Sequence, residues 1–155
     1  MTIMNWVSSN QRSDSAHWLL ITSRTTWSYL RDRREWAFAT KSNPAPDSIH
    51  TGDNAIIYLR AEGVRGPGGL GGAVDFIGQP CRTDDRGLFD QLFPLRIPIR
   101  VTRVVDPPVP FAPIVDQLEF VKNKGNWGGY LQGHAARRLN VNDFNLLLSR
   151  INKSE

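Results

Sequence analysis

The segment Lys122–Tyr130 places a single tryptophan, Trp127, among glycines, amides and two lysines instead of in an apolar run. A ring on a basic, glycine-flanked segment is suited to stacking on a planar ligand while a neighbouring ammonium group contacts a phosphate. A ring folded back onto the core is the alternative interpretation. Nothing around Trp127 can carry out a reaction, so the segment indicates a place that holds a flat anionic ligand without changing it.

Residues that could catalyse a reaction or hold a metal are sparse elsewhere in the chain. His17, His50 and His134 are the only histidines, and none stands near a serine or cysteine nucleophile in a known signature. The pair Asp84-Asp85 lies in a polar stretch with two arginines, which is typical of a solvated loop. Cys81 is the single cysteine and has no partner for a disulfide or a zinc site. We therefore expect no enzyme, no cofactor and no metal.

The stretch Gly66–Gly71 fits the G-x-G-x-x-G pattern of dinucleotide-binding loops. In those loops the glycines open a helix whose N-terminus meets a pyrophosphate. Here the glycines lie between two expected strands, so a flexible hairpin tip explains them better.

Composition indicates one hydrophobic core and a mild preference for anionic partners. The 155 residues are 40% hydrophobic and 22% charged, and 19 lysines and arginines against 15 acids give a formal net charge of +4. No stretch approaches the roughly 18 apolar residues of a membrane span, and the first residues lack the plan of a signal peptide. We expect a single cytoplasmic domain over residues 17–155, no membrane contact, and a loosely ordered N-terminal extension over residues 1–16.

Strands predominate among the elements that must position the candidate residues. Strands are expected at 17–22, 54–60, 72–77, 93–104 and 137–141, with a short alternating piece at 35–38. Helices are expected at 26–33 and from a cap at Asn142 onward, with a helical turn at 114–118. The four prolines of Asp106–Pro113 predict a rigid crossing that is neither strand nor helix. This order of elements indicates an α+β fold.

Motifs spread in order from about His17 to Ile151 carry a family resemblance. They are Trp18–Ser23 with Trp27, Trp36 with its neighbours, Gly52-Asp53 with Ile56–Arg60, Phe93–Ile99, Phe120–Lys124 with Trp127, and Gly133–Leu139 with Asp143-Phe144. Together they resemble the EVE-domain family, part of the PUA-like superfamily that also contains the YTH readers. The resemblance implies a strongly bent mixed β-sheet that forms a pseudo-barrel flanked by helices. It also implies a non-enzymatic nucleic-acid-binding domain that holds a modified base of DNA or RNA between aromatic rings.

The resemblance assigns a base pocket to residues at the ends of strands. The expected pocket residues are Thr22, Ser23, Trp36, Tyr58, Phe93, Asn123 and Trp127. For Trp36, Tyr58 and Phe93, packing in the core is the alternative interpretation. Trp18 and Trp27 are assigned to the core, because their neighbours are apolar or helical in phase.

Cations near these residues are expected to contact the phosphate backbone of the nucleic acid. Phosphate contacts determine the affinity of binding, while the pocket determines which base is bound. They are Arg60, Arg96, Lys122, Lys124, Arg137 and Arg138. Each of them alone is equally explained as a solvated charge. A nucleotide-processing enzyme with the same pocket and a protein-interaction module are the alternative functions, and the sequence predicts no oligomeric state.

Overall fold

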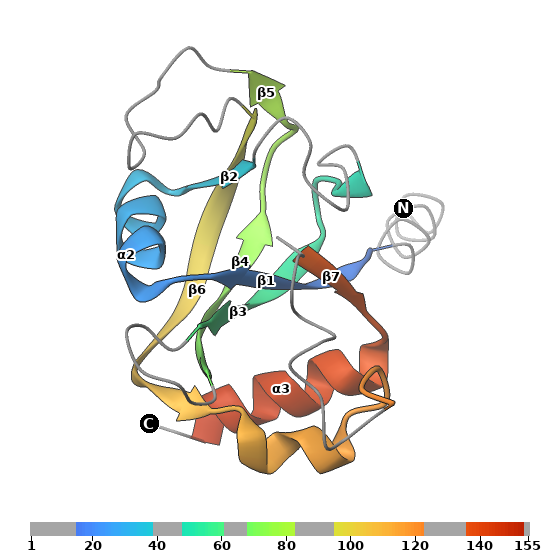
Figure 1. Cartoon of the computed structure of the whole chain (residues 1–155). Helices are drawn as coiled ribbons and strands as arrows, with labels where there is room; N and C mark the ends of the chain where they lie inside the picture. Colours follow the sequence, from blue (N-terminus) through green and yellow to red (C-terminus); the bar gives the residue numbers. More distant parts are fainter. Residues whose placement is uncertain (1–14, 39–47, 61–67, 83–94, 123–135, 154–155) are drawn as a thin grey trace, which may run out of the picture.

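The computed structural model describes residues 15–38, 48–60, 68–82, 95–122 and 136–153 (Figure 1). The strands are β1 (His17–Thr22), β2 (Glu35–Phe38), β3 (Asn54–Leu59), β4 (Gly69–Phe76), β5 (Cys81–Arg82), β6 (Leu95–Pro110) and β7 (Ala136–Leu139). The helices are α2 (Arg24–Arg33), the 3-10 helix η2 (Ala112–Gln117) and α3 (Val141–Lys153). None of these helices is long and apolar enough to cross a membrane.

The strands form one mixed sheet in the order β2-β6-β4-β3-β1-β7, with β5 also paired to β6. β1 and β3 are parallel, and the other pairs are antiparallel. The 16-residue strand β6 pairs with β2 near its start and with β4 along most of its length, and register shifts between β4 and β6 bend the sheet. The predicted α+β class and the strongly bent sheet with flanking helices are therefore confirmed.

Two hydrophobic cores lie on opposite faces of this sheet. Along β1, Leu20 faces the core beneath α2, and Leu19 faces the core closed by η2 and α3. Figure 1 shows α2 and α3 at different ends of the sheet, each covering one of these faces. Because both faces of β1 and β3 are covered, these strands consist of near-continuous apolar runs instead of alternating patterns.

Helix α2 begins directly after β1 because Ser23 caps it. The Ser23 hydroxyl accepts a hydrogen bond from the Thr26 backbone N–H at 3.2 Å, and Arg34 ends the helix in the left-handed conformation with φ of 58°. Trp27 and Leu30 are the buried residues of this helix. The helix thus starts two residues earlier than the sequence predicts.

The expectation that Asp106–Pro113 leaves the sheet is wrong for its first five residues. β6 continues to Pro110, where Val109 pairs with Leu70. The register shifts between Leu70 and Gly72, so the residues that contain the two successive prolines have no partner in β4. A bulge of this kind tolerates prolines, because its residues have no ladder partner and so need no backbone N–H to donate.

The glycine-rich stretch forms the start of strand β4 as well as part of the connection before it. β3 and β4 pair antiparallel, as the predicted hairpin requires, but β4 begins at Gly69 instead of Gly72. A Cβ atom at Gly72 would collide with the Arg103 carbonyl, so this glycine permits the close approach of β4 and β6. No helix begins between Gly68 and Gly72, the described part of this stretch, consistent with the rejection of a dinucleotide-binding loop.

Two buried aspartates join the ends of elements. Asp53 accepts hydrogen bonds from the backbone N–H groups of Ala16 and His50, both at 2.9 Å, and from the Trp18 indole at 3.1 Å. Asp143 accepts from the backbone of Glu119 and Phe120 at 2.8 and 2.9 Å. These contacts secure the start of β1 and the segment after η2.

The ends of the chain differ in two respects from expectation. Ala16, assigned by the sequence to the extension, is buried and bound to Asp53. The cap of α3 is Asn140, whose side-chain oxygen accepts from the Asp143 N–H at 2.7 Å, whereas the Asn142 amide donates to Glu119. Residues 1–14 lie outside the described residues, so the loosely ordered extension stays a prediction.

Replacing Asp53 with asparagine should destabilise the fold by about 2–3 kcal/mol. The amide nitrogen of asparagine would face N–H groups whose hydrogen bonds the buried carboxylate now accepts, and it cannot accept them. Urea unfolding measures this free energy. The matched control is Asp75→Asn, which breaks only the exposed ion pair with Arg100 and should cost less than about 1 kcal/mol. Equal losses in the two variants would contradict a special role for Asp53.

Candidate nucleic-acid interface

The carboxyl ends of β1 and β3 meet because these two strands are parallel. Thr22 lies opposite Leu59, and the backbone N–H of Arg60 donates to the Thr22 carbonyl at 2.8 Å. Helix α2 starts on one side of this corner and Arg60 leaves β3 on the other. Carboxyl ends of parallel strands are common places for ligands, since the chain turns away there and leaves a crevice.

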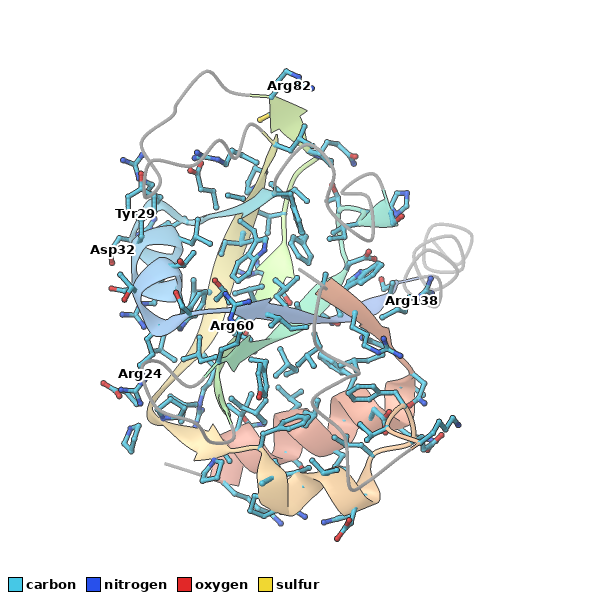
Figure 2. All side chains as sticks on the ribbon, viewed as in Figure 1. Arg24, Tyr29, Asp32, Arg60, Arg82 and Arg138 are labelled. Carbon is cyan, nitrogen blue, oxygen red and sulfur yellow. The ribbon has the colours of Figure 1, made fainter. Side chains whose placement is uncertain are left out.

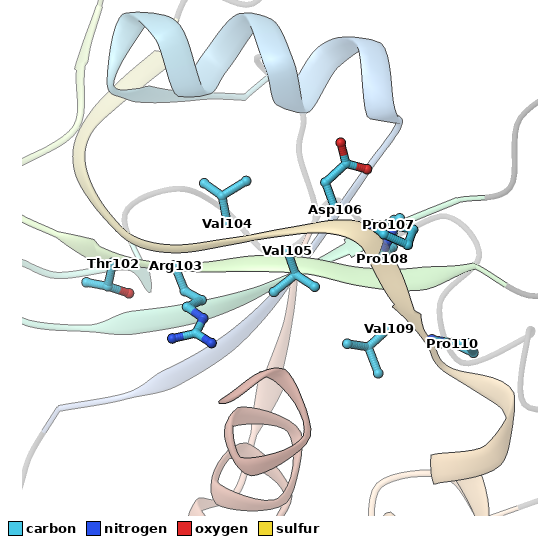
Figure 3. A pocket seen from close by; sticks show the side chains of 9 residues that line it. All are labelled: Thr102, Arg103, Val104, Val105, Asp106, Pro107, Pro108, Val109 and Pro110. Atoms are coloured by element: carbon cyan, nitrogen blue, oxygen red, sulfur yellow. The ribbon is translucent and has the colours of Figure 1, made fainter. Parts of the chain in front are cut away.

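A cavity of about 150 Å³ lies beside this corner, between α2, the end of β3 and the bulge of β6. Its lining residues are Arg24, Trp27, Ser28, Arg31, Leu59, Val105, Asp106 and Pro108. A larger hollow of about 660 Å³ follows β6 from Thr102 to Pro110 and shares part of this lining. Figure 3 shows Val104 and Asp106 on the side of β6 toward α2, with Val105 and Val109 on the other side. A cavity of about 150 Å³ can hold a molecule of the size of benzene.

Trp27 is the aromatic residue of this cavity. Its side chain is only 3% exposed, and within the described residues its indole N–H has no hydrogen-bond partner. The Arg31 guanidinium lies 5.7 Å from the centre of the Trp27 ring. A buried donor without an acceptor costs about 1–3 kcal/mol, and a ligand atom could reach this nitrogen only if neighbouring side chains moved. The sequence correctly assigned Trp27 to the core but missed that it also lines a cavity.

Cations outnumber acids around the cavity. Arg24 and Arg31 are part of the lining, Arg60 leaves the neighbouring strand end, and Asp106 is the one acid of the lining. Arg24 occupies the first position of α2, whose first turn contains no acid. A cation there opposes the helix dipole by about 0.3–1 kcal/mol, so Arg24 does not serve the stability of the helix. Arg24, Ser28 and Arg31 are not among the residues predicted from the sequence, although their i, i+4 and i+7 spacing places them on one helix face.

The strand-end residues Thr22 and Ser23 lie next to the cavity without lining it. Thr22 is buried. The Ser23 hydroxyl accepts from the Thr26 N–H and donates to the Thr26 hydroxyl at 3.0 Å. The Ser23 hydroxyl, which was predicted to contact a base, therefore caps α2 instead.

Two predicted pocket rings pack as core residues, which corrects the expectation that they are open to a ligand. Trp36 is 2% exposed, and its ring centre lies 6.1 Å from that of Trp27 beneath α2. Tyr58 lies in the other core, edge-on to Phe111 at 5.0 Å, and its hydroxyl accepts from the Gly68 N–H at 3.1 Å. Alternation along β2 directs Trp36 into the core beneath α2, and Tyr58 is buried because both faces of β3 are covered.

Arg96 is a second correction among the predicted site residues. Its side chain is buried at 4% exposure and forms an ion pair with Glu35, so it is not an accessible phosphate contact. The cause is the pairing of β2 with β6, which sets Ala37 opposite Arg96 in the interior of the sheet.

Four other predicted cations are at least partly accessible in the described residues but do not form one stripe: Arg60, Lys122, Arg137 and Arg138. Arg138 is exposed and lies 5.9 Å from the Trp18 ring on the α2 face, whereas Arg137 is half-buried against Phe120 on the α3 face. Lys122 is exposed at the end of a described segment. The other predicted site residues, Phe93, Asn123, Lys124 and Trp127, lie outside the described residues.

No protein-family model matches the chain. A UPF0310 protein of Pyrococcus abyssi is 26% identical over 142 residues, which cover 86% of this chain and 98% of that protein. A UPF0310 protein of Pyrococcus horikoshii is 25% identical over 141 residues, which cover 84% and 95%. The similarity to both proteins therefore extends over nearly their whole length.

Solved structures share the fold at low sequence identity. Human THYN1, solved in complex with DNA containing 5-methylcytosine, superposes with a TM-score of 0.58 at 14% identity, over 87% of this chain and 96% of that chain. The Mmi1 YTH domain, solved in complex with RNA, superposes with a TM-score of 0.61 at 11% identity, over 90% and 79%. The chain therefore has the fold of these two domains. The fold that the sequence resemblance implies is thereby confirmed.

The described residues contain no group of three or more His, Cys, Asp or Glu side chains that could hold a metal ion. The candidate interface is thus built from one cavity, three nearby arginines and the two strand ends.

The pKa of Tyr58 depends on groups at the same corner of the sheet, where β1 and β3 end. Burial raises the pKa of its phenol above 10.0, opposed by the hydrogen bond from Gly68 and by the nearby charge of Arg60. Because the unfolded tyrosine then releases its proton at a lower pH than the folded one, folding stability should decrease as the pH rises above 10.0.

Tyr58→Phe should abolish this share of the alkaline loss, while costing about 1 kcal/mol at neutral pH through the lost acceptor for Gly68. Urea midpoints of both proteins between about pH 8 and pH 11 test this, since the other tyrosines are common to both. A wild-type protein that loses no more stability than the variant over this range would contradict the assignment.

Proposed function

We propose that this PUA-like domain is a non-enzymatic binder of nucleic acid that holds one base, a modified one, in the cavity beside Trp27. The observation that carries the proposal is a cavity of about 150 Å³ whose lining combines an aromatic residue, Trp27, with two arginines. The same fold binds DNA with 5-methylcytosine in human THYN1 and RNA in the Mmi1 YTH domain, which supports the proposal.

Different lining residues are expected to contact different parts of the nucleotide. Trp27, Leu59, Val105 and Pro108 supply apolar contact for the faces and edges of a ring. The Asp106 carboxylate accepts from an amino group, as carboxylates do from cytosine. The arginines contact phosphate and set affinity. A base turned out of its stack costs a few kcal/mol, which these contacts must offset.

The predictions for Asn123, Lys124 and Trp127 concern residues outside the described ranges. In the proposed function, Asn123 and Trp127 add an amide and a second wall to the base pocket. Lys124 would then bring a further cation to the phosphate backbone.

The lining favours holding a base over changing it. Asp106 is its one carboxylate and Ser28 its one hydroxyl, and no histidine belongs to it. General acid–base or nucleophilic catalysis needs such groups in pairs within hydrogen-bond reach. Recovery of the bound nucleotide in unaltered form would agree with this view.

Arg24→Glu and Arg31→Glu should weaken binding to every oligonucleotide, because each removes a phosphate contact and adds repulsion. Fluorescence anisotropy at several salt concentrations measures this, and each lost contact should reduce the salt slope of log K by about 0.7 for single strands. Lys153→Glu on α3 changes the charge equally, away from the cavity, and serves as the control. Binding by the wild type that does not depend on salt would overturn the phosphate role.

Ser28→Trp should remove base selectivity while the phosphate contacts persist. Ser28 is exposed on α2 and lines the cavity, so a large ring there fills the space with little cost to the fold. Wild type should prefer a methylated cytosine or adenine by roughly fourfold, from burial of about 0.8 kcal/mol per methyl group. Thr25→Trp, on the same helix outside the lining, is the matched control and should retain the preference. A preference that survives in both variants would place the base elsewhere.

A further inference from the structure

A row of polar side chains crosses the sheet near the start of β1, where the cover provided by α3 ends. It takes one residue from each of β1, β3, β4 and β6: His17, Asn54, Asp75 and Arg100. The His17 ring stacks on Phe144 of α3 with 4.3 Å between the ring centres, which places the row on the α3 face of the sheet. At the other end of the row, Arg100 donates to Asp75 at 2.7 Å, and these side chains are 67% and 31% exposed. The α3 face is therefore open around β4 and β6.

Ile77 is the next residue of β4 on this open face. Its backbone N–H donates to the Pro98 carbonyl at 3.0 Å, which continues the pairing of β4 with β6 by one residue. Because side chains alternate along a strand, Ile77 points to the same face as Asp75. Its side chain is 51% exposed. A single exposed isoleucine is common on protein surfaces, so what matters is the part of the chain beside it.

The first described residue, Ser15, lies at the same end of the sheet, and Gly52 lies between Ser15 and Ile77. The Gly52 N–H donates to the Phe76 carbonyl at 2.9 Å. A Cβ atom on Gly52 would lie 3.8 Å from the Ser15 hydroxyl and, chain neighbours aside, within 4 Å of no other described residue. Gly52 has a φ of 97°, which favours glycine, so the sheet has a gap in its side chains there. Ser15 and Ile77 are two strands apart, which is roughly 10 Å across this gap.

The sequence before Ser15 has two parts of different character. Met1–Val7 contains five apolar residues out of seven, including Ile3 and Trp6, whereas Ser8–Asp14 contains none. The polar part spans up to about 25 Å when extended, so it is long enough to return the apolar part to the sheet. The prediction of a loosely ordered extension suits the polar part alone.

The width of the open face favours a segment of the same chain over a second protein as its occupant. Four strands about 4.8 Å apart make the face roughly 14 Å wide. A stable interface with another protein buries about 800 Å² on each partner, which is more than so narrow a face offers. A tethered segment needs less area, because its effective concentration at the face is about millimolar.

We propose that Met1–Val7 folds back over Gly52 and packs Trp6 on Ile77, so that the chain closes the open end of its own sheet. This contact does not depend on the proposed function. Figure 2 shows Arg82, which follows shortly after Ile77 in the chain, at the end of the molecule away from Arg24 and Arg60. Oligonucleotide binding at the cavity and docking of Met1–Val7 can therefore be measured separately.

The test uses Cys81, the single and exposed cysteine, to attach a paramagnetic label near Ile77 in the full chain. The label should broaden the NMR signal of the Trp6 indole, which the variant Trp6→Phe assigns. Ile77→Ser should remove the broadening. Val104→Ser changes an exposed valine on the side of β6 toward α2, and should retain it. Deleting residues 1–7 should lower the Tm of the wild type by about 2–4 °C and leave that of Ile77→Ser unchanged.

Three outcomes would overturn the proposal. A Trp6 signal that the label leaves sharp would show that the segment does not reach this face. Broadening that survives Ile77→Ser would show that it docks elsewhere. Equal broadening in a mixture of labelled chains with separate, isotope-enriched unlabelled chains would assign the face to a second copy.

Discussion

The parallel pairing of β1 and β3 is the constraint on which the rest of the molecule depends. It places Thr22 against Leu59 and so brings together the start of α2 and the exit of β3. The same pair carries both hydrophobic cores, since Leu20 and Leu19 face opposite sides of the sheet. The candidate interface thus follows from the alignment of two strands that are buried along nearly their whole length.

Much of this arrangement was predictable from local patterns, because burial on both faces leaves a continuous apolar run and a serine beside a helix start is a strong signal. The strands around His17–Thr22 and Asn54–Leu59, the helix after Ser23 and the α+β class followed from such patterns, whereas the strong bend of the sheet was implied by the family resemblance. β6 beyond Val104 did not follow, because proline statistics describe ordinary ladders and cannot anticipate a bulge opposite Gly71.

The candidate site was less predictable, because exposure is decided by tertiary packing. Trp36 and Trp27 are near in space and similarly buried, yet only Trp27 lies in the wall of the cavity. Arg96 and Arg100 lie on one strand four residues apart, and the first is enclosed with Glu35 while the second is exposed. No local pattern distinguishes the members of these pairs, whereas the pairing partners of their strands do.

The sequence separation of the β1–β3 pair has a consequence for the order of folding. His17 and Asn54 are joined across 37 positions, whereas the contacts that cap α2 span three. Closing the longer loop costs chain entropy before any contact compensates for it, so the helix can form early and the parallel pair closes late. A nascent or partly unfolded chain therefore presents basic helix residues without the strand end beside them. The proposed site is complete only in the fully assembled sheet.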